Sequence, residues 1–165
     1  MSILRRYNFP GAIYFITNIT HDRQPFLVAE VDLFWLAIET MKKRSRFDLI
    51  AWVILPDHFH IIIDPLENNI SELMKRIKLS FSMNYRKKQS LKNQNVWQKR
   101  FWDHIIRNQD DFNRHIDYIH YNPVKHGLAN NPLDYKHSSI SKFSEYYQED
   151  WGVTEKIKFN GDYGE

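Results

Sequence analysis

Two short apolar runs joined by a turn constrain the fold of this chain more than any other stretch. The first spans Ile50–Leu55, the second spans His58–Asp64, and Pro56-Asp57 lies between them. Short runs rich in isoleucine, valine and aromatic residues, bounded by turn residues, are typical of buried strands. The sequence therefore predicts a tight hairpin in the interior of a sheet.

The second of these strands places two histidines on one face. Side chains alternate along a strand, so His58 and His60 point the same way, with Cβ atoms roughly 7 Å apart. Phe59, Ile61 and Ile63 then point the other way, into a core. Two imidazoles on one face of a rigid strand can bind the same metal ion, which makes this strand a candidate metal site in need of a third ligand.

Further strands and helices are predicted on both sides of the hairpin. Residues 12–20 and 101–107 have the composition of strands, and apolar residues recur at helical spacing over residues 30–46. Asn69 and Glu72 resemble a capping box at the start of another helix. The order is the ferredoxin-like βαββαβ arrangement of the α+β class, in which helices cover one face of a mostly antiparallel sheet.

One more helix comes after this unit. Asp110 can cap it, Pro123 interrupts it, and Gly127 ends the short segment after the proline. From Asn130 onward the chain is polar, with scattered aromatic residues. We expect a single domain over residues 1–165, in which residues 130–165 form a C-terminal tail.

Composition excludes several classes of protein. The 165 residues include no cysteine, which removes disulfide frameworks, thiolate nucleophiles and sulfur-ligated zinc. No apolar run approaches the ~20 residues that span a bilayer, and the N-terminus lacks the long apolar stretch of a signal peptide. We expect a cytoplasmic protein with no membrane partner.

Positive charge is concentrated in one segment. Residues 75–107 contain ten lysines and arginines and a single acid, Asp103. Basic residues interleaved with aromatic ones favour a nucleic-acid surface, although a solvated helix face has the same pattern.

The helix after the fourth strand carries two residues that complete the candidate site. Tyr118 and Asn122 are four residues apart and share one face. Asn122 could supply the third metal ligand, and a phenol, with a pKa near ~10, is a feasible nucleophile beside a cation. Asn122 could instead cap a short helix that begins at Pro123. Other candidate ligands are His104, His120, Asp57 and Asp64, although Asp57 should point away from the histidines.

These residues lie within a longer series of motifs that, taken in order, match those of a known protein family. The chain resembles the REP-associated tyrosine transposases, a branch of the single-tyrosine HUH endonucleases related to insertion-sequence transposases. The matching stretches, in order, are YFITNIT, WVILPDHFHIII, KRIKLSFSMNYRKK, VWQKRFWDHIIR, YIHYNPVKHGL and SSISKFSEYYQEDWG. The HUH element falls on His58-Phe59-His60, and the Tyr-x-x-x-Asn pair falls on Tyr118 and Asn122.

The resemblance implies a metal-dependent endonuclease and strand transferase that acts on single-stranded DNA. Tyr118 would form a 5′-phosphotyrosine and leave a 3′-hydroxyl, while His58, His60 and Asn122 would hold Mg²⁺ or Mn²⁺. The implied substrates are repetitive extragenic palindromic (REP) elements, which fold into hairpins. The alternatives are a catalytically silent binder of DNA repeats and a hydrolase in which water is the nucleophile. Either a monomer or a homodimer is compatible, with Tyr118 acting in cis or in trans.

A hairpin substrate requires contacts to phosphates and to unpaired bases. Base stacking on an aromatic ring is worth ~1–3 kcal/mol. The candidates for stacking are Tyr85, Trp97 and Trp102, and those for phosphate binding are Arg5, Arg6, Lys75, Arg76, Lys78, Arg86, Lys87, Lys88, Lys99 and Arg100. The composition of the tail suggests a cover over the site or over the DNA groove.

Overall fold

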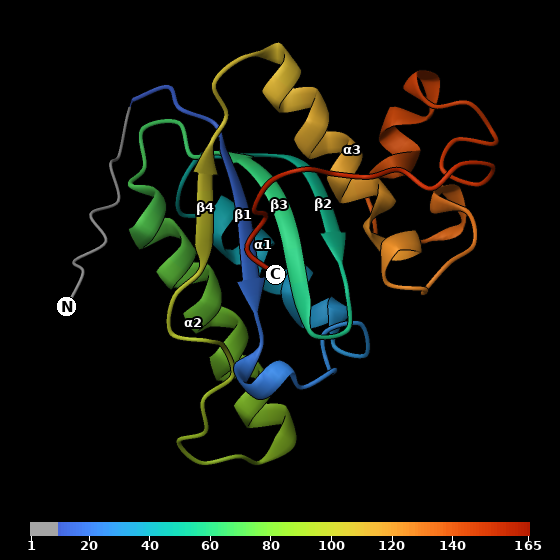
Figure 1. Ribbon diagram of the computed structural model, residues 1–165. Helices are drawn as coiled ribbons and strands as arrows, with labels where there is room; N and C mark the ends of the chain where they lie inside the picture. Colours follow the sequence, from blue (N-terminus) through green and yellow to red (C-terminus); the bar gives the residue numbers. More distant parts are fainter. Residues whose placement is uncertain (1–9) are drawn as a thin grey trace.

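The predicted hairpin lies inside a four-stranded antiparallel sheet with the order β2-β3-β1-β4 (Figure 1). The computed structural model describes residues 10–165, so Arg5 and Arg6 lie outside the described residues. This order and the two helices between the strands confirm the ferredoxin-like α+β prediction. The main elements are β1 (Tyr14–Ile19), α1 (Val31–Lys42), β2 (Asp48–Ile54), β3 (His58–Asp64), α2 (Ile70–Gln89), β4 (Trp102–Ile105) and α3 (Gln109–Lys125).

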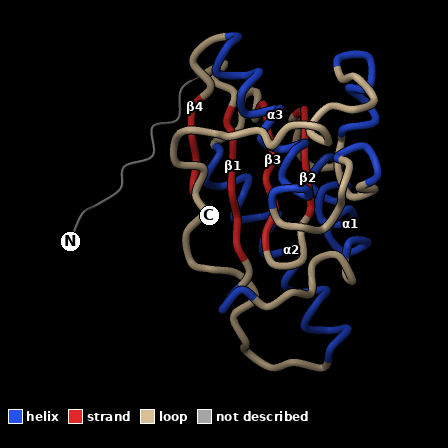
Figure 2. Tube along the Cα trace, turned by 45° about the vertical axis from the view of Figure 1, so that its right-hand side comes forward, coloured by secondary structure: helices blue, strands red, loops and turns tan. Residues whose placement is uncertain are grey.

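Both faces of the sheet are covered, which explains why its central strands are apolar without strict alternation. Phe59, Ile61 and Ile63 of β3 pack in a core with α1 and α2. Phe15 and Ile62 face the other side, in a second core that includes residues of α3. The loop that ends at Glu165 crosses in front of β3 and β1 in both views (Figures 1 and 2). The two histidines therefore lie on the face that α3 and this loop cover.

Helix α3 differs from its prediction at both ends. Its N-cap is Asn108, which accepts a hydrogen bond from the backbone of Asp111 at 2.9 Å, so the prediction of Asp110 as the cap is wrong. The helix also continues through Pro123 to Lys125, so the predicted interruption at Pro123 is wrong as well. Pro123 lies in the last turn, and its missing N–H removes only one hydrogen bond of the helix. As a result Asn122 is a residue of the helix and not the cap of a new one.

The segment after α3 forms two short 3-10 helices, η2 (Pro132–Asp134) and η3 (Ile140–Tyr146), and then an irregular chain. His120 of α3 attaches this segment to the domain: its Nε2 lies 2.9 Å from Ser139 Oγ and its Nδ1 lies 2.9 Å from the Tyr147 hydroxyl. Ser139 Oγ also accepts a hydrogen bond from the backbone of Trp52 in β2. Among the described helices, none is both long and apolar enough to cross a membrane.

Candidate active site

Two neighbouring side chains set the orientation of the histidine rings. His58 Nδ1 lies 2.6 Å from Asp57 Oδ1, and His60 Nδ1 lies 2.7 Å from Thr17 Oγ1. The Thr17 hydroxyl donates to a backbone carbonyl, so its oxygen accepts the proton of His60 Nδ1. Both Nδ1 atoms donate hydrogen bonds, so the lone pair of each Nε2 is free to bind a metal ion. Histidines that ligate metals commonly have their other ring nitrogen held by a hydrogen bond in this way.

The position of Asp57 corrects the expectation that it points away from the histidines. Strand β3 begins at His58, so Asp57 lies in the turn, where the alternation of a strand does not apply. Its carboxylate is also paired with Arg23 at 3.2 Å. Asp57 therefore orients His58 from outside the candidate site.

Helix α3 brings Tyr118 and Asn122 against the histidines. The rings of His60 and Tyr118 have centroids 5.3 Å apart, and both Tyr118 and Asn122 are buried. Two buried acceptors here, His58 Nε2 and Asn122 Oδ1, have no hydrogen-bond partner among the described residues. Burial lowers the pKa of His60 to about 4, which keeps its imidazole neutral and able to bind a cation. The donor set, two imidazole nitrogens and one amide oxygen, fits a divalent metal ion.

The rival metal ligands lie elsewhere. His104 Nε2 is 2.8 Å from Asp111, which is also 3.2 Å from His115, so these three form a separate cluster. His120 is hydrogen-bonded to the tail, and Asp64 Oδ1 accepts a hydrogen bond from the backbone of Leu66. His104, His120 and Asp64 therefore all have partners other than His58 and His60, and of the four rivals only Asp57 contacts one of these two histidines.

Glu165 is the main site residue that the sequence did not predict. Its Oε1 lies 2.8 Å from His60 Nε2 and 3.6 Å from His58 Nε2, and it accepts a hydrogen bond from Asn122 Nδ2 at 2.8 Å. Burial opposes ionisation of Glu165, but the surrounding imidazoles of His126, His58 and His60 hold the pKa of its carboxyl well below the usual range. A carboxylate oxygen and a neutral imidazole lone pair repel at this distance unless a cation or proton lies between them. The contact therefore marks a position suited to a cation.

The chain before Glu165 covers the tyrosine. The Tyr163 ring stacks on the Tyr118 ring, with centroids 3.8 Å apart and planes 9° from parallel. Gly164 has a positive φ of 77°, and a Cβ added there would lie 2.5 Å from Trp102. Only glycine fits this bend, which turns Glu165 into the site. The tail was expected to cover either the candidate site or the DNA groove. Residues 163–165 lie over the candidate site, against the histidines and Tyr118.

Lys125 completes the surroundings of the Tyr118 hydroxyl. Its Nζ donates a hydrogen bond to that oxygen at 2.8 Å, lies 4.9 Å from the centre of the ring and forms an ion pair with Glu165. Burial of the phenol, and then the neighbouring Glu165, raise the pKa of Tyr118 above its usual value. A cation beside the oxygen favours the phenolate, so Lys125 acts against these two effects. Lys125 is seven residues after Tyr118, a helical spacing that could have revealed it in the sequence.

The predicted DNA contacts divide into three groups. Lys75, Lys78, Arg86 and Lys99 line one groove between α2 and residues 95–101. Arg76, Lys87 and Arg100 are exposed but do not line it. Lys88 forms an ion pair with Glu30 at 2.5 Å, which ties the end of α2 to the start of α1.

The three predicted stacking residues all have partners within the protein. Trp97 is only 8% exposed and packs in the core with Phe59 and Phe81. Tyr85 stacks on Phe26, with centroids 4.5 Å apart. Trp102 is half-buried beneath Gly164. All three rings thus make contacts within the protein, because the same aromatic character that predicts base stacking also suits packing.

Comparison with known proteins identifies the class. Residues 9–122 match the family described as "Transposase IS200 like", a family of DNA-processing enzymes. This match covers more than half of the chain, and the chain belongs to this family.

Individual relatives narrow the identification. The REP-associated tyrosine transposase of Escherichia coli K12 is 34% identical over 86% of this chain and 84% of its own length. A Haemophilus influenzae protein assigned to the same class is also 34% identical, over 98% of this chain and 99% of its own length. A solved REP-associated tyrosine transposase bound to a REP hairpin is 35% identical, with a TM-score of 0.80 over 94% of each chain. These comparisons confirm the resemblance to the REP-associated tyrosine transposases.

A more distant structure supports the fold alone. It comes from Deinococcus radiodurans and is 18% identical, with a TM-score of 0.51 over 71% of this chain and 93% of that chain.

Proposed function

We propose that this protein is a metal-dependent endonuclease and strand transferase that cuts single-stranded DNA next to a hairpin and becomes covalently joined to it through Tyr118. The observation that carries the proposal is the convergence of His58 Nε2 and His60 Nε2 on Glu165 Oε1, which the Asn122 side-chain amide also contacts, beside the Tyr118 ring. A bound Mg²⁺ or Mn²⁺ would polarise a phosphodiester oxygen there and orient the bond to be broken.

The residues of the chain supply the nucleophile and its surroundings. The Tyr118 oxygen attacks phosphorus, the bond to the 3′ oxygen breaks, and a 5′-phosphotyrosine forms. The phenol loses its proton in this step, and the departing 3′ oxygen gains one. Lys125 stabilises the phenolate through the hydrogen bond that it donates. The phosphotyrosine keeps the energy of the broken bond, so a 3′-hydroxyl can later rejoin the strand without ATP.

The same geometry favours action within one chain. Tyr118 lies 5.3 Å, between ring centroids, from His60 of its own chain, so a second protomer is not needed to bring nucleophile and metal ligands together. The substrate is inferred from the solved relative bound to a REP hairpin and from the basic side chains along α2. We therefore propose a monomer that acts in cis on a hairpin of the REP type.

The test is a search for a covalent protein–DNA adduct. The purified protein is incubated with a 5′-labelled or 3′-labelled hairpin bearing single-stranded flanks, with Mg²⁺, Mn²⁺ or a chelator. We expect an adduct that survives denaturation, forms only with metal and carries the label of the 3′ fragment. Tight binding without cleavage would indicate the silent binder instead. Repeated cleavage without an adduct would indicate a hydrolase.

Glu165 should restrain this reaction, because its carboxylate occupies the place beside His60 that a substrate phosphate needs. Replacing Glu165 with glutamine removes the negative charge and keeps the size of the side chain. We expect adduct formation to become about tenfold faster, since a contact between charged groups worth about 1.5 kcal/mol no longer competes with substrate. The measurement is the single-turnover rate of adduct formation at saturating metal.

A second substitution separates displacement of the tail from loss of charge. Gly164→Ala keeps Glu165 but forces the chain away from Trp102, so it should also raise the rate. Gly11→Ala is the matched control, because Gly11 has almost the same φ, 76°, and its added Cβ would meet no atom within 4 Å. A slower reaction in both Glu165→Gln and Gly164→Ala would show that Glu165 assists the reaction and does not block it.

Lys125→Met should slow adduct formation by about 10- to 100-fold, in the range of a lost electrostatic contact to a developing charge. Methionine retains much of the aliphatic stem and removes the donor to Tyr118. Without the cation the phenol ionises at higher pH, so the rate should rise with pH further into the alkaline range than in the unaltered protein. The measurement is the pH profile of the single-turnover rate. An unchanged profile would contradict the role of Lys125.

A further inference from the structure

A recess lies between α3 and η3, and none of its lining residues belongs to the candidate active site. It encloses a cavity of about 460 Å³. Residue Ser138, just before η3, pairs with β2, so the recess lies toward the edge of the sheet opposite β4 (Figure 1). Its lining includes four aromatic rings and one carboxylate: Phe112, Asp117, Phe143, Tyr146 and Tyr147. We call it the aromatic recess.

The rings of the aromatic recess are held in a defined arrangement. Phe112, Phe143 and Tyr147 are half-buried and pack against the second core. Tyr146 is 81% exposed, and its ring centroid lies 6.3 Å from that of Phe143, with the two planes inclined by 47°. The face of an aromatic ring carries partial negative charge and attracts cations. Two inclined rings at the exposed side of a recess therefore suit a cation with an apolar stem.

Asp117 adds a full negative charge to the same lining. Its Oδ1 accepts a hydrogen bond from the Tyr147 hydroxyl at 3.0 Å, and no cationic side chain among residues 10–165 pairs with it. Burial raises the pKa of the Asp117 carboxyl, because the ionised form loses contact with water. A cation that enters the recess would compensate this loss, since a partly buried charge is unfavourable chiefly when it has no partner.

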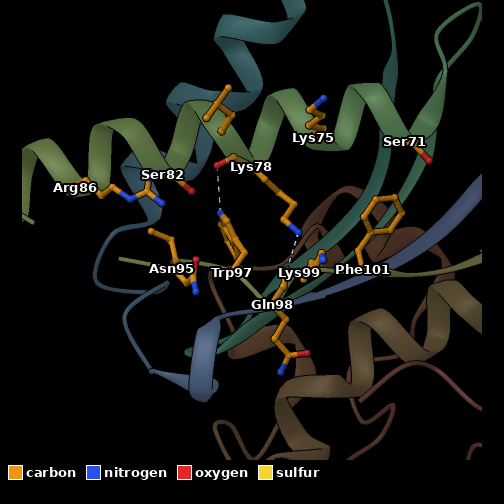
Figure 3. A pocket seen from close by; sticks show the side chains of 12 residues that line it. Ser71, Lys75, Lys78, Ser82, Arg86, Asn95, Trp97, Gln98, Lys99 and Phe101 are labelled. Carbon is orange, nitrogen blue, oxygen red and sulfur yellow. Dashed lines mark hydrogen bonds between the residues drawn. The ribbon is translucent and has the colours of Figure 1, made fainter. Parts of the chain in front are cut away.

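The aromatic recess is opposite in charge to the groove along α2. Lys75, Lys78 and Lys99 line that groove and are labelled in Figure 3. The described lining of the aromatic recess includes no lysine, arginine or histidine, and the exposed Glu145 lies between its lining residues in η3. A phosphate backbone is attracted to the groove and repelled by the recess, so the ligand of the recess is a cation and not DNA.

We propose that the aromatic recess binds an arginine side chain of a partner protein. A guanidinium group is flat, stacks on aromatic faces and donates paired hydrogen bonds to a carboxylate, which matches Tyr146, Phe143 and Asp117. Around the recess, Tyr146 and the exposed amides of Gln109 and Asn113 offer contacts to the chain on either side of the arginine. Tyrosine and arginine are the side chains most often found at the energetic centre of protein interfaces.

The test measures binding of a blocked alanine-arginine-alanine tripeptide to the full chain, from the shifts of backbone amide signals in NMR spectra. We expect a dissociation constant on the order of 1 mM, as a ligand of this size allows. The same tripeptide with citrulline keeps the shape of arginine without its charge and should bind about tenfold more weakly. Free arginine lacks the flanking chain and should bind about threefold more weakly.

Substitutions locate the binding. Asp117→Asn keeps an acceptor for Tyr147 and should weaken binding of the arginine tripeptide about tenfold. Glu145→Gln is the matched control, because it removes an exposed charge of η3 that does not line the recess, and it should change affinity by less than about twofold. Tyr146→Ala should weaken binding about three- to fivefold, whereas Tyr146→Phe keeps the ring and the affinity. Asp117→Asn should not lower the unfolding temperature, since it removes a half-buried carboxylate that has no cation. If it does unfold the protein, Tyr146→Ala still tests the proposal at a mostly exposed residue.

Equal affinity for the arginine and citrulline tripeptides would overturn the proposal, and so would unchanged affinity in either folded variant, Asp117→Asn or Tyr146→Ala. Free arginine that binds as tightly as the tripeptide would overturn the assignment to a partner protein and indicate a small-molecule cation. Loss of single-stranded DNA binding in Tyr146→Ala would assign the recess to DNA instead. None of these measurements requires strand cleavage, so their outcome is independent of the proposed nuclease activity.

Discussion

Tyr118→Phe should abolish the covalent adduct and strand cleavage, with a loss of at least about 10³-fold in rate. The substitution removes only the hydroxyl. The phenyl ring can still stack on Tyr163 and pack in the second core, so the fold should persist. The lost hydrogen bond from Lys125 is worth about 1 kcal/mol, a small part of the stability of a domain.

The control for this substitution lies on the same helix. Tyr121→Phe removes the hydroxyl of another buried tyrosine of α3, three residues later. It should form the adduct at the normal rate. Denaturing electrophoresis measures the adduct, and binding of the flanked hairpin together with thermal unfolding shows that both variants are folded. An adduct undiminished in Tyr118→Phe would remove Tyr118 from the mechanism.

The part of the site that the sequence predicts is the part set by local periodicity. The alternation along β3 places His58 and His60 on one face, and the four-residue spacing on α3 places Tyr118 with Asn122. The order of strands and helices then predicts the sheet that carries them. Each of these features depends on residues close together in the chain, where geometry follows from secondary structure.

The missing part depends on contacts between distant residues. Glu165 is 105 residues from His60, and no pattern in an irregular segment indicates where it will lie. The aromatic residues show the same limit. Trp97 and Trp102 suggest base stacking by composition, but their burial depends on how α2 and the tail pack. The prediction for Pro123 is wrong because a proline in the last turn has little effect on a helix that is already formed.

The second histidine cluster makes the metal assignment a sharp test. His104, Asp111 and His115 also have ligand atoms close enough to hold a cation. However, Asp111 accepts a hydrogen bond from the backbone of Arg107 and lies within 4 Å of the Arg107 and Arg114 guanidinium groups, so the cluster already has positive partners. His58 Nε2 and Asn122 Oδ1 have no such partner in the described structure. We therefore expect a cation to bind more tightly beside His58 and His60 of β3 than in the second cluster.

His60→Gln should consequently remove both metal binding and cleavage. We expect addition of Mn²⁺ to raise the unfolding temperature of the unaltered protein, since a ligand that binds only the folded state stabilises it. His60→Gln should lose this shift and slow adduct formation by at least about 100-fold, because it removes one of the three proposed ligands of the ion. His104→Gln is the matched control in the other cluster and should retain both. The thermal shift is measured without DNA, so it reports the metal site even if Tyr118 is not the nucleophile. A shift that His104→Gln abolishes and His60→Gln retains would move the metal to the second cluster, and would leave the convergence of His58, His60 and Asn122 without its proposed function.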